Sequence, residues 1–496
     1  MSCHSSMIGS EFTGADIEAT VERGGLLSVE IEPSLACNFR CQYCYNGGES
    51  ACVDELSFDE LCDVIRQAKA LGARKIIVLG GEPMIYPRIM ELLAFIRGES
   101  LMAEMFTNGT RVSAGAARQL FDLGTQVVLK MNSFDDAIQD EMAGFTGAAA
   151  IIRTAFENLS AAGFPSPGHL FAVSTVICSR NLPEIRTMWA WLRDRKITPY
   201  FEIITPQGNA REGQELEVES PLLHQLFKDL SAMDRDRYGI AWEAQPPLVG
   251  DRCLRHQYSC LVGATGTVTP CVGVTIPLGN VRERKLGEIL HDSEVVRDLR
   301  RYQQTIQGPC ADCERAKVCY GCRGAAYQLT GDYLASDPLC WHNEAHLDRI
   351  VKLPMPVDGL IPHAAPMQLV DRLISVGERV ATVEATIRAD HLFVDDGGTL
   401  NPAAYVELIA QAAAVMNGFR PAGRKGRGLE GYLLGARQIE VADTAHVGDT
   451  LEIRVSKTTS FGDFGVIEGR VSRGETLLAK GEIKVWHKAA EPNTGK

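Results

Sequence analysis

The chain has no long apolar run and no excess of basic residues. No apolar stretch reaches the roughly eighteen residues of a membrane-spanning helix. Residues 1–25 lack the basic start and apolar centre of a signal peptide. The 50 basic against 63 acidic residues give a net charge of -13, which argues against a nucleic-acid partner. Internal repeats are also absent. From these observations together we expect a globular cytoplasmic protein that binds neither membranes nor nucleic acid.

No cysteine occurs after Cys340, although the chain has 15 cysteines. The composition changes at 351–356, just beyond this limit, so we expect a new domain to begin there. At roughly 150 residues per domain, a chain of this length suggests about three domains. A reducing compartment keeps thiols free, so we interpret the cysteines as metal ligands rather than as disulfides.

The first chemical motif is a C-x3-C-x2-C run formed by Cys37, Cys41 and Cys44. Three thiolates are one fewer than an iron-sulfur cube takes, so one iron would stay open for another ligand. A zinc site or unligated core cysteines are the simpler alternatives, since thiolates also bind zinc. Downstream, the strand-like run 75–79 leads into Gly80, Gly81, Glu82 and Pro83. Glycines permit a close backbone approach, and a carboxylate can accept hydrogen bonds from an ammonium group.

Together these two motifs resemble the signature of the radical S-adenosylmethionine (SAM) enzymes. The resemblance implies that the amino and carboxylate groups of SAM occupy the open iron. It implies that one electron from the cube cleaves SAM to methionine and a 5'-deoxyadenosyl radical, which abstracts hydrogen from an unreactive carbon. It also implies that Gly80, Gly81, Glu82 and Pro83 hold the SAM amino group, with Glu82 contacting the ammonium.

The first half of the chain alternates strand-like and helical segments, which predicts an α/β fold with a parallel sheet. By resemblance we expect an incomplete (β/α)6 barrel, in which loops after the strands build the site. Asn108, Ser133, Asn181 and Gly208 lie in such loops and are candidate cofactor contacts, although each could be an ordinary loop residue. The expected strands are 26–33, 75–79, 103–107, 126–132, 171–178 and 200–205, with helices such as 58–70, 89–97, 151–162 and 182–195.

Eight cysteines between residues 252 and 341 resemble the SPASM extension of radical SAM enzymes. The resemblance implies two auxiliary cubes in a small cysteine-rich domain. Two residues separate Cys319 from Cys322, where the family usually has three. A double zinc ribbon is the alternative, but its C-x2-C pairs usually stand about fifteen to twenty residues apart. The implied ligands are Cys253, Cys260, Cys271 and Cys322 for the first cube and Cys310, Cys313, Cys319 and Cys340 for the second; Cys3, Cys52, Cys62 and Cys178 are left without a metal.

The last part of the chain combines one apolar helix with several alternating strands, 432–439, 450–457, 465–472 and 476–486. This pattern suggests an α+β hot-dog fold, a curled antiparallel sheet around a helix. Asn401 is the expected cap and Pro402 lies in the first turn. Because the helix is apolar nearly all round, we expect it to be buried. Burial would raise the pKa of Glu407 and keep a proton available for donation; a buried glutamate satisfied by backbone is the alternative.

His391 lies sixteen residues before Glu407, and the pair resembles the histidine and glutamate of the 3-hydroxyacyl-carrier-protein dehydratases, particularly the aryl-polyene branch. The resemblance implies that the histidine removes the proton beside the thioester carbonyl and that the glutamic acid protonates the departing hydroxyl. It also implies a backbone oxyanion donor at the helix start. Leu392 follows the histidine where many relatives have proline. A thioesterase or an inactive binding module therefore stays open, since hot-dog folds host several functions.

These observations favour a bifunctional biosynthetic enzyme, a radical SAM/SPASM enzyme fused to a dehydratase-like domain. The expected cofactors are three 4Fe-4S clusters and SAM. The expected partners are an acyl carrier protein or acyl thioester, an electron donor, and a second copy of the chain bound through the hot-dog domain; the basic loop 420–427 could meet an acidic carrier. The predicted parts are an N-terminal extension 1–25, a radical SAM core 26–245, a SPASM domain 246–346, a linker 347–356, a hot-dog domain 357–490 and a tail 491–496.

Two other interpretations stay open. In one, the hot-dog domain is a noncatalytic dimerisation or acyl-binding module on a peptide- or protein-modifying radical enzyme. The roughly twenty-five residues before the barrel are too few for a leader-peptide-binding domain, which disfavours peptide substrates. In the other, the chain is an electron-transfer or scaffold protein without SAM turnover, against which the segment Gly80 to Pro83 argues.

Overall fold

The computed structural model describes residues 11–47, 54–211, 216–250, 252–350, 353–358, 360–376, 379–419, 431–461 and 464–487. The chain folds into two compact units, Met1–Asn343 and Glu344–Lys496. Each unit has a hydrophobic core of its own. Cys3, Cys52, the basic loop 420–427 and the tail 491–496 lie outside the described residues. Among the described helices, none is both long and apolar enough to cross a bilayer.

The first unit is built on six parallel strands that lie side by side in chain order, which confirms the predicted parallel sheet. Most of the strand side chains are buried, as expected of a sheet covered on its faces by other elements. The strands are β1 (Ser28–Ile31), β2 (Lys75–Val78), β3 (Met102–Thr107), β4 (Gln126–Lys130), β5 (Phe171–Ile177) and β6 (Thr198–Ile203).

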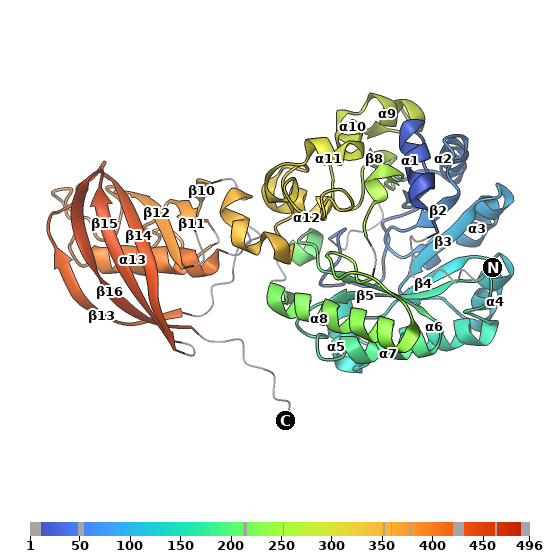
Figure 1. Ribbon diagram of the computed structural model, residues 1–496, viewed down its shortest axis with the longest axis horizontal. Helices are drawn as coiled ribbons and strands as arrows, with labels where there is room; N and C mark the ends of the chain where they lie inside the picture. Colours follow the sequence, from blue (N-terminus) through green and yellow to red (C-terminus); the bar gives the residue numbers. More distant parts are fainter. Residues whose placement is uncertain are drawn as a thin grey trace. The chain divides into compact units, whose positions relative to one another are not determined.

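Helices connect these strands and cover the sheet (Figure 1). In α2 (Phe58–Ala70), Ser57 and Glu60 form a reciprocal capping box, and the buried Leu61, Ile65 and Ala68 recur at helical spacing. The other helices of this part are α1 (Gly14–Glu22), α3 (Ile89–Gly98), α4 (Ala114–Asp122), α5 (Asp136–Ala143), α6 (Ala148–Ala162), α7 (Ile185–Asp194) and α8 (Ser220–Met233).

The cysteine-rich segment continues the same sheet. β7 (Leu261–Val262) pairs in parallel with β1, β8 (Thr267–Thr269) pairs antiparallel with β7, and β9 (Gly279–Asn280) pairs antiparallel with β8. The sheet therefore has nine strands in the order β6-β5-β4-β3-β2-β1-β7-β8-β9 and runs on beyond residue 245. The helices of this segment are α9 (Leu286–Asp292), α10 (Glu294–Arg300), α11 (Tyr302–Thr305) and α12 (Arg323–Thr330).

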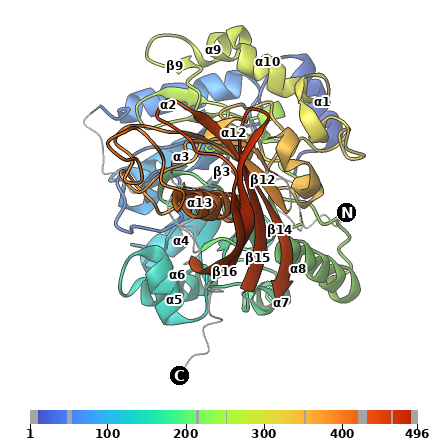
Figure 2. The same ribbon diagram turned by 90° about the vertical axis from the view of Figure 1, so that its left-hand side faces the viewer.

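The second unit is an antiparallel sheet with one long helix, α13 (Ala404–Gly418), packed against one face (Figure 2). The strand order is β10-β11-β12-β14-β15-β16-β13, so β13 forms an edge. Along β13 nearly every described residue is exposed, including Tyr432, Leu433 and Leu434. The strands are β10 (Met355–Pro356), β11 (Arg372–Val376), β12 (Val380–Thr386), β13 (Gly431–Val441), β14 (Thr450–Phe461), β15 (Phe464–Arg473) and β16 (Thr476–His487).

The start of α13 differs from the prediction. The helix begins at Ala404, and its N-cap residue is Ala403 without a side-chain hydrogen bond. Asn401 instead closes a preceding turn, because its side-chain oxygen accepts from the Ala403 amide at 2.9 Å and its carbonyl accepts from the Ala404 amide at 2.9 Å. An Asn or Asp side chain often stabilises such a turn rather than a helix cap.

Candidate functional site

The glycine-rich loop after β2 packs directly against the loop that carries the three N-terminal cysteines. The Gly81 amide donates to the Ser34 carbonyl at 2.9 Å, and the Glu82 amide donates to the Ala36 carbonyl at 2.8 Å. A Cβ added at Gly81 would lie only 2.0 Å from the Ala36 oxygen. The close backbone approach therefore requires glycine at position 81. The backbone that it approaches, at Ala36, is one residue before Cys37.

Cys37, Cys41 and Cys44 lie close enough to affect one another's thiol pKa values. Burial is the largest cause that raises the pKa of Cys41 to about 12, and its two neighbouring cysteines raise it further. Burial also raises the pKa of Cys37, with contributions from Glu82 and Cys44. A bound metal cluster would supply the positive charge that reverses this preference for the neutral thiol. The donor set therefore fits an iron-sulfur cube.

Among the described residues, no three His, Cys, Asp or Glu side chains surround a single metal-ion position. Zinc requires such convergence, because its four ligands all bind one ion at about 2.0–2.3 Å. The cysteines of a cube bind different irons, so they need to lie near one another without sharing one centre.

Glu82 is buried, with 3% of its surface exposed, and its carboxylate is already occupied by groups of the chain. It accepts hydrogen bonds from the Met84 amide at 2.9 Å, from the Thr107 hydroxyl at 2.6 Å and from the Asn108 amide at 2.6 Å. Burial nevertheless raises its pKa to about 7. Three of roughly four lone-pair positions are thus used, so the side chain mainly ties the glycine-rich loop to the end of β3.

Two of the other predicted SAM contacts, Gly208 and Asn108, lie against the cysteine loop. Gly208 packs against the cysteine loop, since an added Cβ would lie 2.2 Å from the Cys44 oxygen. Asn108 reaches toward the Cys37 sulfur at 4.0 Å and donates to the Asn38 side chain at 3.1 Å.

Two predicted contacts are used inside the fold. The Asn181 amide donates to two backbone carbonyls, those of Asn132 at 2.7 Å and Val176 at 2.9 Å, and its oxygen accepts from the Cys178 amide. The Ser133 hydroxyl donates to the Glu184 carboxylate at 3.0 Å. Asn181 therefore holds loops in place, and Ser133 is engaged in the same way.

Two partly buried cations near the cysteines were not predicted from the sequence. Lys130, at the end of β4, donates to the Ser174 hydroxyl at 3.1 Å and stands 4.9 Å over the Tyr43 ring. Burial lowers its pKa, against the opposing effect of Glu202, Cys41 and Cys44. Lys130 is the one charged residue of the predicted strand 126–132, which was the available signal.

The second such cation is Arg255. It contacts the Glu30 carboxylate at 2.8 Å and the Tyr200 hydroxyl at 3.2 Å.

A cavity of about 360 Å³ opens beside β1, β7 and β8, lined by Glu32, Tyr45, Gly208, Leu261 and Thr267 among others. The Tyr45 hydroxyl donates to Glu32 at 2.7 Å within this lining. This cavity beside the cysteine loop has a mixed polar and apolar lining and suits a small ligand with both kinds of group.

The auxiliary cysteines are mostly buried or half-buried. Burial is the main cause that raises the pKa of Cys271 to about 12, and Cys253 and Glu30 add to the increase. Burial likewise raises the pKa of Cys260 to about 12, and Glu30 adds to the increase while Arg300 opposes it.

The second auxiliary group contains Cys310, Cys319 and Cys340. Burial raises the pKa of Cys340 most strongly, and Cys310 and Cys319 contribute to the increase. Cys313 joins them through a turn in which its amide donates to the Cys310 carbonyl at 3.4 Å. The buried Asp337 accepts from the Cys322 amide at 2.7 Å and from the Leu339 amide at 2.9 Å, so it links the two groups.

In the second unit, Glu407 is half-buried, with 24% of its side chain exposed, so the prediction that it is fully buried was wrong. It accepts a hydrogen bond from Gln411 at 2.8 Å, and the ring of His363 lies 3.7 Å away. The buried Gln411 also donates to the Met367 carbonyl at 2.7 Å. His363 was not singled out from the sequence, although it lies in the opening segment 360–372.

His391 is buried, with 6% of its surface exposed, and its Nε2 has no hydrogen-bond partner among the described residues. The Arg388 amide contacts its Nδ1 at 3.5 Å, a long hydrogen bond. Burial lowers the pKa of His391, and Arg388 adds to this effect. No hydrogen bond or ion pair joins His391 to Glu407 within the described part of the chain.

The expected oxyanion donor at the start of α13 is not free in this conformation. The Ala403 amide donates to the Asn401 side chain, and the Ala404, Tyr405 and Val406 amides donate to the carbonyls of residues 401–403. Pro402 has no amide hydrogen to offer.

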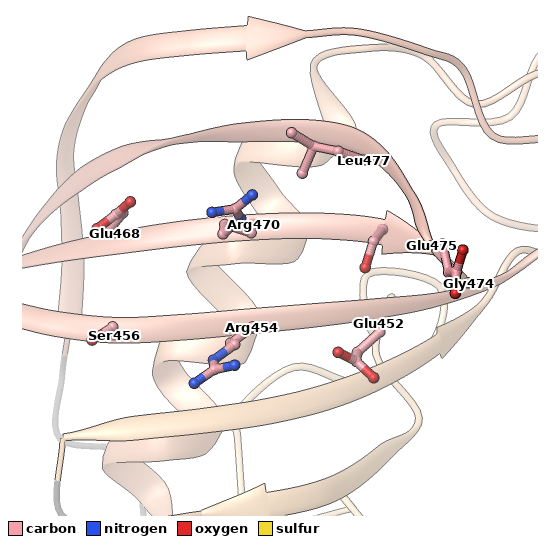
Figure 3. A pocket seen from close by; sticks show the side chains of 9 residues that line it. Glu452, Arg454, Ser456, Glu468, Arg470, Gly474, Glu475 and Leu477 are labelled. Carbon is pink, nitrogen blue, oxygen red and sulfur yellow. The ribbon is translucent and has the colours of Figure 1, made fainter.

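A second cavity, of about 470 Å³, lies on the strands of the second unit away from the predicted pair (Figure 3). Alternating charges line it, among them Glu452, Arg454, Glu468 and Arg470 from β14 and β15. These side chains point away from the helix side of the sheet. Neither His391 nor Glu407 contributes to this cavity.

Three family models match separate parts of the chain. Residues 31–188 match the radical SAM superfamily, residues 253–314 match SPASM, an iron-sulfur cluster-binding domain, and residues 355–494 match the ApeP-like family, described as ApeP dehydratase. The first two domains imply 4Fe-4S clusters and SAM as cofactors.

Individual relatives match the first part of the chain. The AdoMet-dependent heme synthase of Methanosarcina barkeri is 28% identical over 335 residues, covering 62% of this chain and 94% of that protein. The PqqA peptide cyclase of Rhizobium meliloti is 27% identical over 324 residues, covering 61% of this chain and 84% of that protein. The crystal structure of Streptococcus suis SuiB bound to precursor peptide SuiA has 17% identity and a TM-score of 0.50, covering 63% of this chain and 76% of that chain, which supports the fold alone. This protein is a radical SAM enzyme with a SPASM iron-sulfur cluster-binding domain and an ApeP-like dehydratase domain.

Proposed function

We propose that the first unit abstracts hydrogen from a biosynthetic substrate and that the second unit dehydrates a 3-hydroxyacyl thioester in the same pathway. The packing of Gly81 and Glu82 onto the cysteine loop carries the first half of this proposal. When bound, the cube and SAM supply a 5'-deoxyadenosyl radical for hydrogen abstraction. The enzyme's own contribution is to position the cofactor and the substrate.

The residues around the cysteine loop suit this positioning role. Glu82 fixes the glycine-rich loop to the end of β3, and the amino group of the partly buried Lys130 can meet a carboxylate. Gly208 keeps the Cys44 backbone close to the 360 Å³ cavity. We propose this cavity as part of the substrate site.

We further propose that the six parallel strands form an incomplete (β/α)6 barrel and that the second unit is a hot-dog fold. The proposed partners are an acyl carrier protein, a reducing electron donor and a second copy of the chain, and the proposed compartment is the cytoplasm, where thiols stay reduced. The proposed segments are 1–25, a core of 26–245, an auxiliary domain of 246–346, a linker of 347–356, a dehydratase domain of 357–490 and a tail of 491–496.

The first test counts iron. Three cubes would give roughly twelve irons per chain after anaerobic reconstitution, at about four per cluster. Replacing Cys37, Cys41 and Cys44 with alanine should remove about a third of the iron and abolish 5'-deoxyadenosine formation. Cys62→Ala, in the core face of α2, is the matched control and should keep both. Continued SAM cleavage in the triple variant would refute the assignment.

In the proposed dehydratase site, His391 of one chain meets Glu407 of another. The open edge of β13 with its exposed Tyr432, Leu433 and Leu434 supports association with a second copy, since an unpaired edge strand is a template for pairing. If Nε2 of His391 acts as the base, the ring proton must be on Nδ1. A protonated Nδ1 cannot accept the long hydrogen bond from the Arg388 amide, so that hydrogen bond must break. Glu407 lies partly open to solvent and can meet a substrate from its exposed side.

A crossed complementation tests this arrangement. Full-length His391→Ala and Glu407→Ala proteins should each be inactive on 3-hydroxyacyl carrier protein, and their mixture should recover up to about a quarter of wild-type dehydration. This fraction follows because half of randomly mixed dimers are heterodimers with one intact site. Loss of water is followed by mass spectrometry. Activity in either single variant would contradict the assigned roles.

The occupied amides at the start of α13 favour a second candidate function for this unit. Without a free oxyanion donor, the domain would bind acyl groups or mediate dimerisation without catalysis, and the first unit would modify a peptide or protein. A dimer that is inert on several acyl chain lengths, together with unchanged full-length products in the His391 and Glu407 variants, would establish this alternative.

A further inference from the structure

The opening segment 360–372 of the second unit fixes the side chain of Gln411 on α13. The Leu369 backbone amide can only donate, and it donates to the Gln411 side-chain oxygen at 2.8 Å. The Met367 carbonyl can only accept, and it accepts from the Gln411 side-chain nitrogen at 2.7 Å. These two backbone groups therefore allow one orientation of the side-chain amide. Gln411 is fully buried, so solvent does not compete for these hydrogen bonds.

This orientation decides which oxygen of Glu407 faces the protein. The Gln411 side-chain nitrogen also donates to Glu407 Oε1, at 2.8 Å, so Oε1 is a hydrogen-bond acceptor. A protonated carboxyl group has one O–H, which this contact places on Oε2. Oε2 has no hydrogen-bond or ion-pair partner among the described residues, and the side chain is 24% exposed. Glu407 is therefore oriented to give a proton from Oε2 on its open side.

His363 lies beside the other oxygen, Oε1. Its Nε2 is 3.7 Å from Glu407 Oε1, which is too long for a hydrogen bond and close enough for an ion pair. Its Nδ1 is buried and has no hydrogen-bond partner among the described residues, so no contact at that atom holds the ring back. The backbone nearby is close to α13, because a Cβ added at Gly418 would lie 1.9 Å from the Leu360 oxygen. A small rotation of the ring would bring Nε2 within hydrogen-bond distance of Oε1.

We propose that His363 is a positioning residue of the dehydratase site, which closes on Oε1 as Glu407 gives up its proton and stabilises the carboxylate that remains. This inference rests on the proposed function. In that reaction the bond between Oε2 and its hydrogen breaks, the proton joins the departing hydroxyl to form water, and the electron pair stays on Glu407. His391 takes the proton beside the thioester carbonyl, so the protons balance.

The negative charge left on Glu407 then has two donors at Oε1, the Gln411 amide and protonated His363. Hydrogen bonds between two charged groups are stronger than neutral ones, and histidine gains a proton close to neutral pH. The His363 side chain is 30% exposed, so it can take that proton from solvent. Oε2 stays open and can be protonated again for the next turnover.

Steady-state kinetics of the full chain on 3-hydroxyacyl carrier protein test this role. His363→Ala should lower kcat roughly ten- to a hundredfold, the effect of losing a hydrogen bond to a charged group. KM should stay within about twofold, because His363 acts on Glu407 and not on the thioester. His363→Gln, which keeps a neutral donor and protects the fold, should lose less. Imidazole added to His363→Ala should restore part of kcat, because the site is open to solvent.

His446→Ala is the matched control, because His446 is an exposed histidine in the turn before β14, and it should keep both kinetic constants. An unchanged kcat in His363→Ala would overturn the proposal. A loss of kcat that imidazole does not reverse would overturn it too, since it would show a structural role.

A second experiment needs no turnover. In the full chain labelled with 13C-histidine, the NMR signal of the His363 ring is identified by its loss in His363→Ala. Glu407→Gln should shift this signal, because it removes a negative charge beside Nε2, and the signal of His446 is the internal control. An unchanged His363 signal would overturn the proposal. A shifted signal in a protein that dehydrates no 3-hydroxyacyl thioester would refute the proposed dehydration and leave the pairing of His363 with Glu407 standing.

Discussion

A single buried carboxylate, Glu82, connects two loops that both belong to the proposed SAM site. It accepts hydrogen bonds from the Thr107 hydroxyl and the Asn108 amide, and Asn108 in turn approaches the Cys37 sulfur. Burial raises the pKa of Glu82 to about 7, above its usual 4.5. The folded state therefore binds this proton more tightly than the unfolded state does.

The consequence is a defined dependence of stability on pH in the cluster-free protein. Glu82 contributes roughly 3 kcal/mol to the free energy of unfolding below pH 4.5, where it is protonated in both states. This contribution is lost as the pH rises to about 7. Glu82→Gln should flatten this slope. Denaturant midpoints between pH 5 and 8 measure it through tryptophan fluorescence, because Trp189, Trp191, Trp242 and Trp341 all lie in the first unit.

Glu157→Gln is the matched control for this measurement, because Glu157 is exposed on α6. Its slope should equal that of the wild type. An identical slope in the Glu82 variant would show that the buried carboxyl titrates normally.

Sequence reasoning located Glu82 and Glu407 but misjudged their surroundings. The partners of Glu82 lie 25 and 26 residues away, on a neighbouring strand end, and no local pattern reports them. The apolar helix around Glu407 predicted burial, but periodicity shows only which face a residue occupies, not whether another element covers that face. His391 was singled out from the sequence for a catalytic role; its buried Nε2, which has no hydrogen-bond partner among the described residues, is a tertiary feature that no local pattern predicts.

At the scale of elements, the glycine-rich loop and the cysteine loop behave as one unit. An alanine at Gly81 would place its Cβ 2.0 Å from the Ala36 oxygen, so one of the two loops must move. Gly81→Ala should therefore lose about a third of the reconstituted iron and most SAM cleavage, with the auxiliary clusters retained. Iron analysis and 5'-deoxyadenosine assays measure both effects.

Gly98→Ala provides the comparison, because a Cβ at Gly98, in the last turn of α3, meets nothing within 4 Å. It should keep all the iron. If Gly81→Ala also retains full iron, the contact between the loops does not shape the cluster site.

Long elements were predictable and short ones were not. The six parallel strands carry apolar runs, and each overlaps its predicted segment. β7, β8 and β9 are only two or three residues long, too short for a periodic signal. Their pairing with β1 nevertheless decides where the segment around Cys260 lies, and the spacing of the cysteines does not report that pairing.

At the scale of the molecule, the chain divides into two compact units at residues 343 and 344, whereas the sheet of the first unit runs on past residue 245. A fragment of residues 1–343 should keep iron and SAM cleavage, and a fragment of 344–496 should fold without iron. A fragment of 1–250 should aggregate, because it lacks β7 and exposes the edge of β1. Circular dichroism, iron content and size-exclusion chromatography distinguish these outcomes; a stable, monomeric 1–250 fragment would contradict the shared sheet.

The pairing of β1 with β7 also implies a delay during synthesis of the protein, between translation of the first strand and translation of its partner. Ser28 and its partner Ser259 are separated by 231 positions. At about 5–20 residues per second, a ribosome needs roughly 10–50 s to make the intervening chain. During that interval the nascent β1 has an unpaired edge, and the first three cysteines are already exposed to the cell. The interval is long enough for chaperones and iron-sulfur carriers to reach the growing chain before its sheet can close.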